Sequence, residues 1–188
     1  SPWAEAYYKR PYSFAYAATG ENPYHWMLHE VTHQLLAEAS GYKLRRWMNE
    51  GMATYLGSSK ISGNVLQVGN PDKTAYPIWW LAEVRFDQSS KPTFSGSPIP
   101  SLQQIVEESG PPVGENVNSY YISWWSLVHF LMQGDGGAHR QGTIELLKEG
   151  GSPDAFQRLI GNYTDIEPRW HLHLQSLTNS GTTSSGGL

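Results

Sequence analysis

The chain has 188 residues, a formal net charge of −4 and no cysteine. These values predict one domain with one core, exclude disulfides, and, with no run of Lys and Arg, argue against nucleic acid as a partner. No apolar stretch approaches the ~20 residues that cross a bilayer, so no membrane span is expected. We expect a single domain over residues 1–178 and a low-complexity, disordered tail over residues 179–188.

The first expected elements are a short strand and a helix. An aromatic-rich segment opens the chain, and residues 13–17 within it can form a strand. A helix is predicted next, because Asn22 is a good N-cap and Pro23 suits the first helical position. This helix is expected to end near Ser40 and Gly41, where glycine favours termination.

A second helix is predicted from about Leu44 to Leu56, with Gly57 able to cap its end. Its apolar residues recur at helical spacing: Leu44, Trp47, Met48, Met52, Tyr55 and Leu56. Only residues 40–43 link the two helices, so we expect them to pack as antiparallel neighbours. Gly51 and Ala53 are small enough to permit a close approach between them.

The rest of the chain predicts one hairpin and several helices. We expect a hairpin over residues 57–69 with a Gly63-Asn64 turn, followed by a helix over 77–86 and a loop over 87–100. A capping box opens the next predicted helix, over 101–109. One further helix is expected to end at Met132, and three more are expected over 142–149, 154–160 and 166–177. The predicted fold class is therefore mainly α with some β structure: two antiparallel helices, a small hairpin, an edge strand and a C-terminal helical bundle.

The first of the two paired helices carries the pattern His29-Glu30-x-x-His33. Residues four apart lie on the same face of a helix, so both imidazoles can bind one zinc ion. Glu30 lies about 100° around the helix from His29, where its carboxylate can act on water without being a metal ligand. The spacing therefore predicts a metal site with a general base beside it.

The second helix supplies the expected third ligand, Glu50, within Trp47-Met48-Asn49-Glu50-Gly51-Met52-Ala53-Thr54-Tyr55. An isolated glutamate on an amphipathic helix is usually a solvated surface charge. Antiparallel packing of the two helices would instead bring Glu50 back towards the histidines. Three protein ligands leave a fourth position open, which is typical of catalytic zinc sites.

H-E-x-x-H followed by W-x-x-E-G-x-A-x-Y resembles the gluzincin metallopeptidases, most closely their peptidase MA-like domains. The resemblance implies a zincin-like α+β fold, one Zn²⁺ per chain held by His29, His33 and Glu50, and Glu30 as the general base. It extends to residues 121–131 and 170–174, which are similar to later helices of those proteins. The chain differs in having only 28 residues before His29, too few for a full sheet.

Related gluzincins also use a tyrosine from a later helix to stabilise the oxyanion. The resemblance implies Tyr121 for this role, with Tyr120 as the alternative, although either can be a packed core tyrosine. His129 lies about two turns after Tyr121 and either contacts a metal ligand or, more often for such a residue, is packed in the core. Asn49, beside Glu50, is a candidate for substrate binding.

The sequence thus predicts zinc-dependent hydrolysis of peptide or protein substrates. An aminopeptidase needs an acidic group for the free amine, and neither Glu21 nor Glu38 is convincingly placed, so an endopeptidase is favoured. The alternative is a non-catalytic, zinc-stabilised module that binds protein or glycan, but such a module has no need for Glu30. Eight tryptophans and many Ser, Gly and Asn residues suit an extracytoplasmic or secreted location. The oligomeric state is not predicted.

Overall fold

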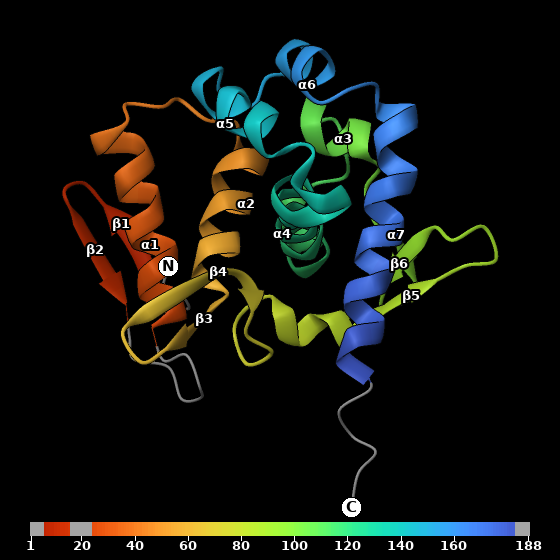
Figure 1. Ribbon diagram of the computed structural model, residues 1–188, viewed down its shortest axis with the longest axis horizontal. Coiled ribbons are helices and arrows are strands. Elements are labelled where there is room, and N and C mark those ends of the chain that lie inside the picture. Colours follow the sequence, from red (N-terminus) through yellow and green to blue (C-terminus); the bar gives the residue numbers. More distant parts are fainter. Residues whose placement is uncertain (1–5, 16–23, 183–188) are drawn as a thin grey trace, which may run out of the picture.

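Two helices, α2 (Arg46–Gly57) and α4 (Val117–Gln133), lie at the centre of the structure, with the other elements around them (Figure 1). The computed structural model describes residues 6–15 and 24–182. Helices predominate over strands in these residues, which confirms the mainly α fold class.

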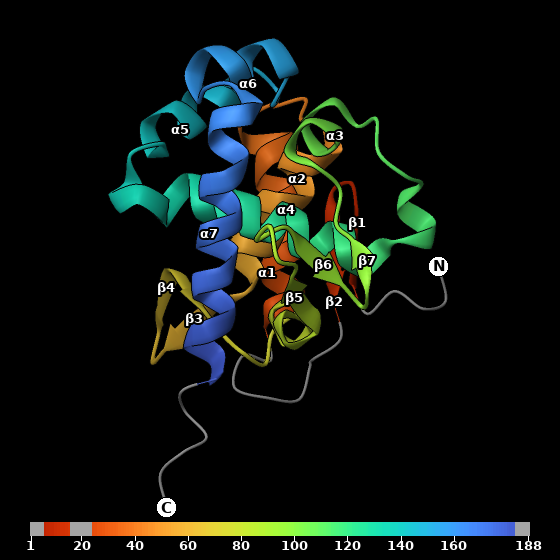
Figure 2. The same ribbon diagram turned by 90° about the vertical axis from the view of Figure 1, so that its right-hand side faces the viewer.

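Helix α4 forms the core of the molecule. Every side chain from Ile122 to Leu131 is buried, including those on all sides of the helix. A helix that is apolar all round is stable only when other elements enclose it. Helix α7 (Tyr163–Thr182) crosses it (Figure 2), and the indole N–H of Trp170 donates to the hydroxyl of Ser126 at 3.0 Å. The buried hydroxyl of Ser126 on this core helix thereby has a partner within the protein.

Helix α1 (His25–Gln34) continues into a π-helical turn, Leu35–Ala39. Helix α1 lies beside α2 and runs in the opposite direction (Figure 1). This confirms the predicted antiparallel pair. The predicted start of the helix at residues 22 and 23 lies outside the described residues, and the described helix follows Tyr24.

The glycine that lets α1 approach α2 is not the predicted one. A Cβ on Gly51 would lie 2.7 Å from Val128 Cγ2, so Gly51 faces α4. A Cβ on Gly57 would lie 2.9 Å from the carbonyl oxygen of His25. Gly57 therefore permits the contact with α1, because its position on the helical surface, and not its nearness to Glu50 in sequence, decides which neighbour it meets.

Three small antiparallel sheets surround the helices. They are β1 (Ala6–Lys9) with β2 (Tyr12–Ala15), β3 (Ser59–Ser62) with β4 (Val65–Pro71), and β5 (Val84–Phe86) with β6 (Pro92–Phe94) and β7 (Ser97–Pro98). The second is the predicted hairpin. In the first, β2 contains residues 13–15 of the predicted strand, whose residues 16 and 17 lie outside the described residues, and its partner β1 was not predicted.

The segment from Pro77 to Phe86 differs from the predicted helix. Residues Ile78–Glu83 form a 3₁₀ helix, and the chain then extends into β5. The predicted loop 87–100 contains β6 and β7, which pair with β5 as a three-stranded sheet. Pairing with strands later in the chain is a tertiary effect, so the local pattern of Trp79 and Trp80 could not reveal it.

The C-terminal helices are α3 (Leu102–Glu107), α5 (Arg140–Lys148), α6 (Pro153–Leu159) and α7. Ser101 and Gln104 form the predicted capping box. Helix α7 is longer at both ends than predicted and includes residues 179–182 of the expected tail, while residues 183–188 lie outside the described residues. No helix in the described part of the chain combines the length and apolar character needed to cross a bilayer.

His129 belongs to the core and is not part of the predicted metal site. Its Nε2 donates to the carbonyl oxygen of Gly69 at 3.1 Å, and its Nδ1 lies 2.8 Å from Nε2 of His173. Burial lowers the pKa of His129 to about 4, and the neighbouring His173 acts in the same direction. A neutral His129 that accepts a hydrogen bond from His173 is consistent with both contacts.

We expect this histidine to make the fold sensitive to acid. The pKa of His129 in the folded protein lies below the ~6.5 of an unfolded chain, so the unfolded state binds more protons between those pH values. As the pH falls from 6.5 to 4, His129 should lower the free energy of unfolding by on the order of 3 kcal/mol. Urea unfolding at several pH values measures this. His129→Gln should flatten the dependence, and an unchanged slope in that variant would contradict the assignment.

Candidate metal centre

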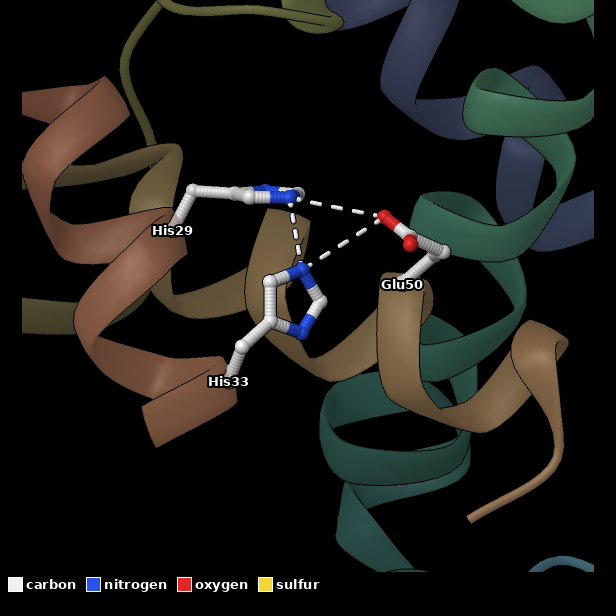
Figure 3. A group of neighbouring side chains, drawn as sticks. All are labelled: His29, His33 and Glu50. Atoms are coloured by element: carbon white, nitrogen blue, oxygen red, sulfur yellow. Dashed lines mark hydrogen bonds and ion pairs between the residues drawn. The ribbon is translucent and has the colours of Figure 1, made fainter. Parts of the chain in front are cut away.

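Three side chains converge between α1 and α2 (Figure 3). His29 and His33 project from successive turns of α1, and Glu50 projects from α2. Nε2 of His29 lies 3.0 Å from Nε2 of His33, and Oε2 of Glu50 lies 3.4 Å and 3.7 Å from these two nitrogens. Among the described residues, this is the one group of three or more His, Cys, Asp or Glu side chains close enough to hold a metal ion.

The spacing of these three atoms fits a zinc ion. Ligand atoms around a tetrahedral zinc ion, with bonds of about 2.0–2.1 Å, lie roughly 3.3 Å apart. Two imidazoles and one carboxylate are also a common donor set for catalytic zinc. The predicted ligands His29, His33 and Glu50 are therefore together in the fold, and small movements would allow them to share one ion.

Asn49 orients one of the two histidines. Its Oδ1 lies 3.1 Å from Nδ1 of His33, so His33 donates its Nδ1–H and turns the lone pair of Nε2 towards the other ligands. The sequence suggested Asn49 as a substrate-binding residue, and its contact with His33 was not predicted. The sequence feature that could have predicted this contact is the position of Asn49 beside Glu50, because α2 presents both residues to α1.

Tyr121, and not Tyr120, faces this site. The hydroxyl of Tyr121 donates to Oε2 of Glu50 at 3.0 Å. The hydroxyl of Tyr120 donates instead to the carbonyl oxygen of Pro111 at 2.7 Å. Burial raises the pKa of the Tyr121 hydroxyl, and the charge of Glu50 raises it further, so Tyr121 is a neutral donor.

Tyr76 also adjoins the site and was not predicted. Its ring centroid lies 5.2 Å from that of Tyr121, and its hydroxyl donates to Oδ1 of Asn118 at 3.3 Å. Tyr76 lies between β4 and the 3₁₀ helix, in a segment without a recognisable motif. Only the folding of this segment against α4 brings it near Tyr121.

The two carboxylates of the site have opposite electrostatic environments. Burial raises the pKa of Glu30, and the charge of Glu50 raises it further. The charge of His33 and the backbone N–H of Tyr8 act against them and lower that pKa. Burial also acts to raise the pKa of Glu50, but the hydrogen bond from His29, the charges of His29 and His33 and the Tyr121 hydroxyl outweigh it and lower that pKa. Glu50 is thus suited to remain ionised as a ligand, and Glu30 to exchange protons.

A cleft of about 530 Å³ opens over these groups. Its walls come from β1, from α1 and α2, from the loop between them and from α4; the lining residues are Ala6, Tyr7, Tyr8, His29, Glu30, His33, Ala37, Tyr42, Lys43, Leu44, Asn49, Glu50 and Tyr121. The cleft is large enough for several atoms of a small molecule beside His29, His33 and Glu50.

Of the two acidic residues considered for binding a free amine, Glu38 does not line this cleft as far as the described residues define it. Glu21 lies outside the described residues, and Glu38 accepts a hydrogen bond from the Tyr8 hydroxyl and lies 3.7 Å from the guanidinium of Arg10. Glu38 therefore links the β1–β2 hairpin to the π-helical turn after α1.

Comparisons with protein-family models, with curated proteins and with solved structures each returned no match. The interpretation of the site consequently depends on its own residues and their geometry.

Asn49 should contribute to metal affinity through His33. We expect Asn49→Ala to weaken zinc binding by about 10–100-fold, because loss of a hydrogen bond to a ligating histidine frees its ring orientation. Competition with a chromophoric chelator measures the affinity. Asn70→Ala, which removes an exposed contact with Gln67 on β4, is the matched control and should change nothing. Equal zinc affinities of wild type and Asn49→Ala would contradict the role of Asn49 in orienting His33.

Proposed function

We propose that the protein is a zinc-dependent peptidase, with endopeptidase activity favoured over aminopeptidase activity. One observation carries this proposal: Nε2 of His29, Nε2 of His33 and Oε2 of Glu50 converge at the base of a cleft that Glu30 and Tyr121 also line. A purely structural zinc site is normally closed by four protein ligands, whereas this group offers three.

The proposed reaction divides between the metal and the side chains. When bound by His29, His33 and Glu50, a zinc ion would polarise a carbonyl group and lower the pKa of a water molecule. Glu30 would accept the proton of the attacking water at its carboxylate and pass it to the nitrogen of the leaving amine. The raised pKa of Glu30 supports this role, because a base that later acts as an acid needs a pKa nearer neutrality.

Tyr121 would stabilise negative charge on the carbonyl oxygen. Its hydroxyl is protonated and already donates to a carboxylate oxygen of the site, so it can donate to an oxyanion that forms beside Glu50. Tyr76 packs against its ring and would limit its movement. Donors that are oriented before the reaction cost little reorganisation in the transition state.

The cleft favours cleavage within a chain. Glu30 and Glu50 are the only acidic side chains that line it among the described residues, and both have roles at the metal. Within the described part of the chain, no further carboxylate is therefore placed there to bind a free amino terminus. Substrates would lie between β1 and the loop that follows α1.

Purified protein should contain about one zinc ion per chain, and Glu30→Gln should retain that zinc while kcat/KM falls by about 10²–10⁴-fold. Elemental analysis gives the stoichiometry, and cleavage of a mixed peptide substrate, with a chelator control, gives the activity. Zinc-loaded wild type that cleaves no peptide would instead support a non-catalytic binding module. Undiminished activity in Glu30→Gln would exclude Glu30 as the base.

Tyr121→Phe should lower kcat by about 10²–10³-fold, because one preorganised donor to the oxyanion is lost. Tyr120→Phe is the matched control: it removes a hydroxyl from the adjacent residue, whose partner is Pro111, and should leave kcat nearly unchanged. Zinc content must be measured in both variants, since Tyr121 also contacts Glu50. A normal kcat in zinc-loaded Tyr121→Phe would contradict the proposed role.

A further inference from the structure

The cleft wall contains one cation, Lys43. The loop between α1 and α2 contributes Tyr42, Lys43 and Leu44 to the lining, and among the described residues no other Lys or Arg lines the cleft. Lys43 is exposed and has no ion-pair partner within the described part of the chain. Its ammonium group is therefore available to a molecule that enters the cleft.

The backbone on both sides of Lys43 is fixed. The N–H of Tyr42 donates to the carbonyl oxygen of Leu36 at 3.0 Å, and the N–H of Arg45 donates to that of Gly150 at 2.9 Å. These bonds attach the loop to the end of α1 and to the turn after α5. Lys43 thus extends from a defined position on the rim, and only its side chain remains free to adjust.

Formal charges leave Lys43 uncompensated. A divalent ion at His29 and His33 would be balanced by the two carboxylates that line the cleft, Glu30 and Glu50. The charge of Lys43 has no counterpart in that lining. The same stretch, residues 40–46, also contains Arg45 and Arg46 and no acidic residue.

Two acidic groups on the adjoining elements, Glu108 and Glu38, have other partners. Glu108, at the end of α3, lies 3.6 Å from the guanidinium of Arg45 and accepts the backbone N–H of Arg46 at 2.7 Å. Glu38 contacts Tyr8 and Arg10 of the hairpin. Within the described part of the chain, Lys43 therefore keeps its charge without an acidic partner, although the chain as a whole carries a net charge of −4.

We propose that Lys43 makes the protein prefer substrates that carry a carboxylate close to the scissile bond, either an Asp or Glu side chain or a C-terminal carboxylate. The proposal rests on the function proposed above and adds a substrate class to it. Lys43 acts through charge on a partly exposed surface, so its effect is moderate, roughly three- to fivefold at low ionic strength. Screening reduces it as salt is added, because the Debye length shortens to about 8 Å at 0.15 M.

The test uses zinc-loaded protein and labelled peptides of one sequence that differ at single positions. In one set an Asp or an Asn occupies each of three positions on either side of the bond that wild type cleaves. In the other set the C-terminus is a free acid or an amide. Binding is measured by fluorescence anisotropy in the Glu30→Gln background, where hydrolysis is suppressed, and cleavage is measured with Glu30 intact.

Three variants are compared in both assays: Lys43→Ala, Lys43→Glu and, as a control, Lys91→Ala, which removes an exposed lysine after β5 that does not line the cleft. We expect Asp over Asn, or acid over amide, to be preferred by roughly three- to fivefold in wild type and in Lys91→Ala. The preference should disappear in Lys43→Ala, reverse in Lys43→Glu and decrease with salt. The peptide set that responds identifies a side-chain or a terminal carboxylate as the recognised group.

Equal binding and cleavage of the acidic and neutral peptides by wild type would overturn this proposal and leave the peptidase function intact. A preference that survives in Lys43→Glu would overturn it as well. Absence of cleavage by zinc-loaded wild type, combined with Lys43-dependent binding of acidic peptides, would overturn the peptidase function and retain the recognition of carboxylates.

Discussion

The close packing of α1 against α2 is the constraint on which the metal centre depends. At Gly57, a Cβ would lie 2.9 Å from the carbonyl oxygen of His25 and 3.3 Å from Cβ of His29. This absence of a side chain lets α1 approach, and the short link between the helices makes them antiparallel. His29 and His33, one turn apart, then face Glu50 on the neighbouring helix (Figure 3). The π-helical end of α1 and the fixed loop after it maintain that alignment.

The same packing concentrates polar groups whose burial without hydrogen-bond or charge partners would be costly. A carboxylate and two imidazole nitrogens lie within 4 Å of one another, and Tyr121 adds a hydroxyl to the same carboxylate oxygen. Such groups are stable in a protein when they are mutually hydrogen-bonded or bind a cation. The hydrogen bond from Nδ1 of His33 to Asn49 turns the Nε2 lone pair of His33 towards these groups, where a metal ion could accept it. The arrangement is therefore compatible with metal binding on its geometry alone.

Local rules predicted the parts of the site that depend on one or two adjacent helices. The spacing of His29 and His33 fixes their common face, and a short link between the two helices favours an antiparallel return to Glu50. Contacts between distant segments were not predictable in this way: Tyr76 reaches Tyr121 only because the segment after β4 folds against α4, and strand β5 exists through its pairing with β6. Gly51 was assigned to the wrong neighbour, because two helices, α1 and α4, contact α2 on different faces.

The central claim is that His29, His33 and Glu50 bind one zinc ion. The most direct test is a crystal structure of the zinc-loaded protein with anomalous data collected on both sides of the zinc absorption edge. The account predicts one strong anomalous peak about 2.0–2.2 Å from Nε2 of His29, Nε2 of His33 and a carboxylate oxygen of Glu50. No peak at this position, or a zinc ion bound elsewhere while these three side chains keep their mutual contacts, would contradict it.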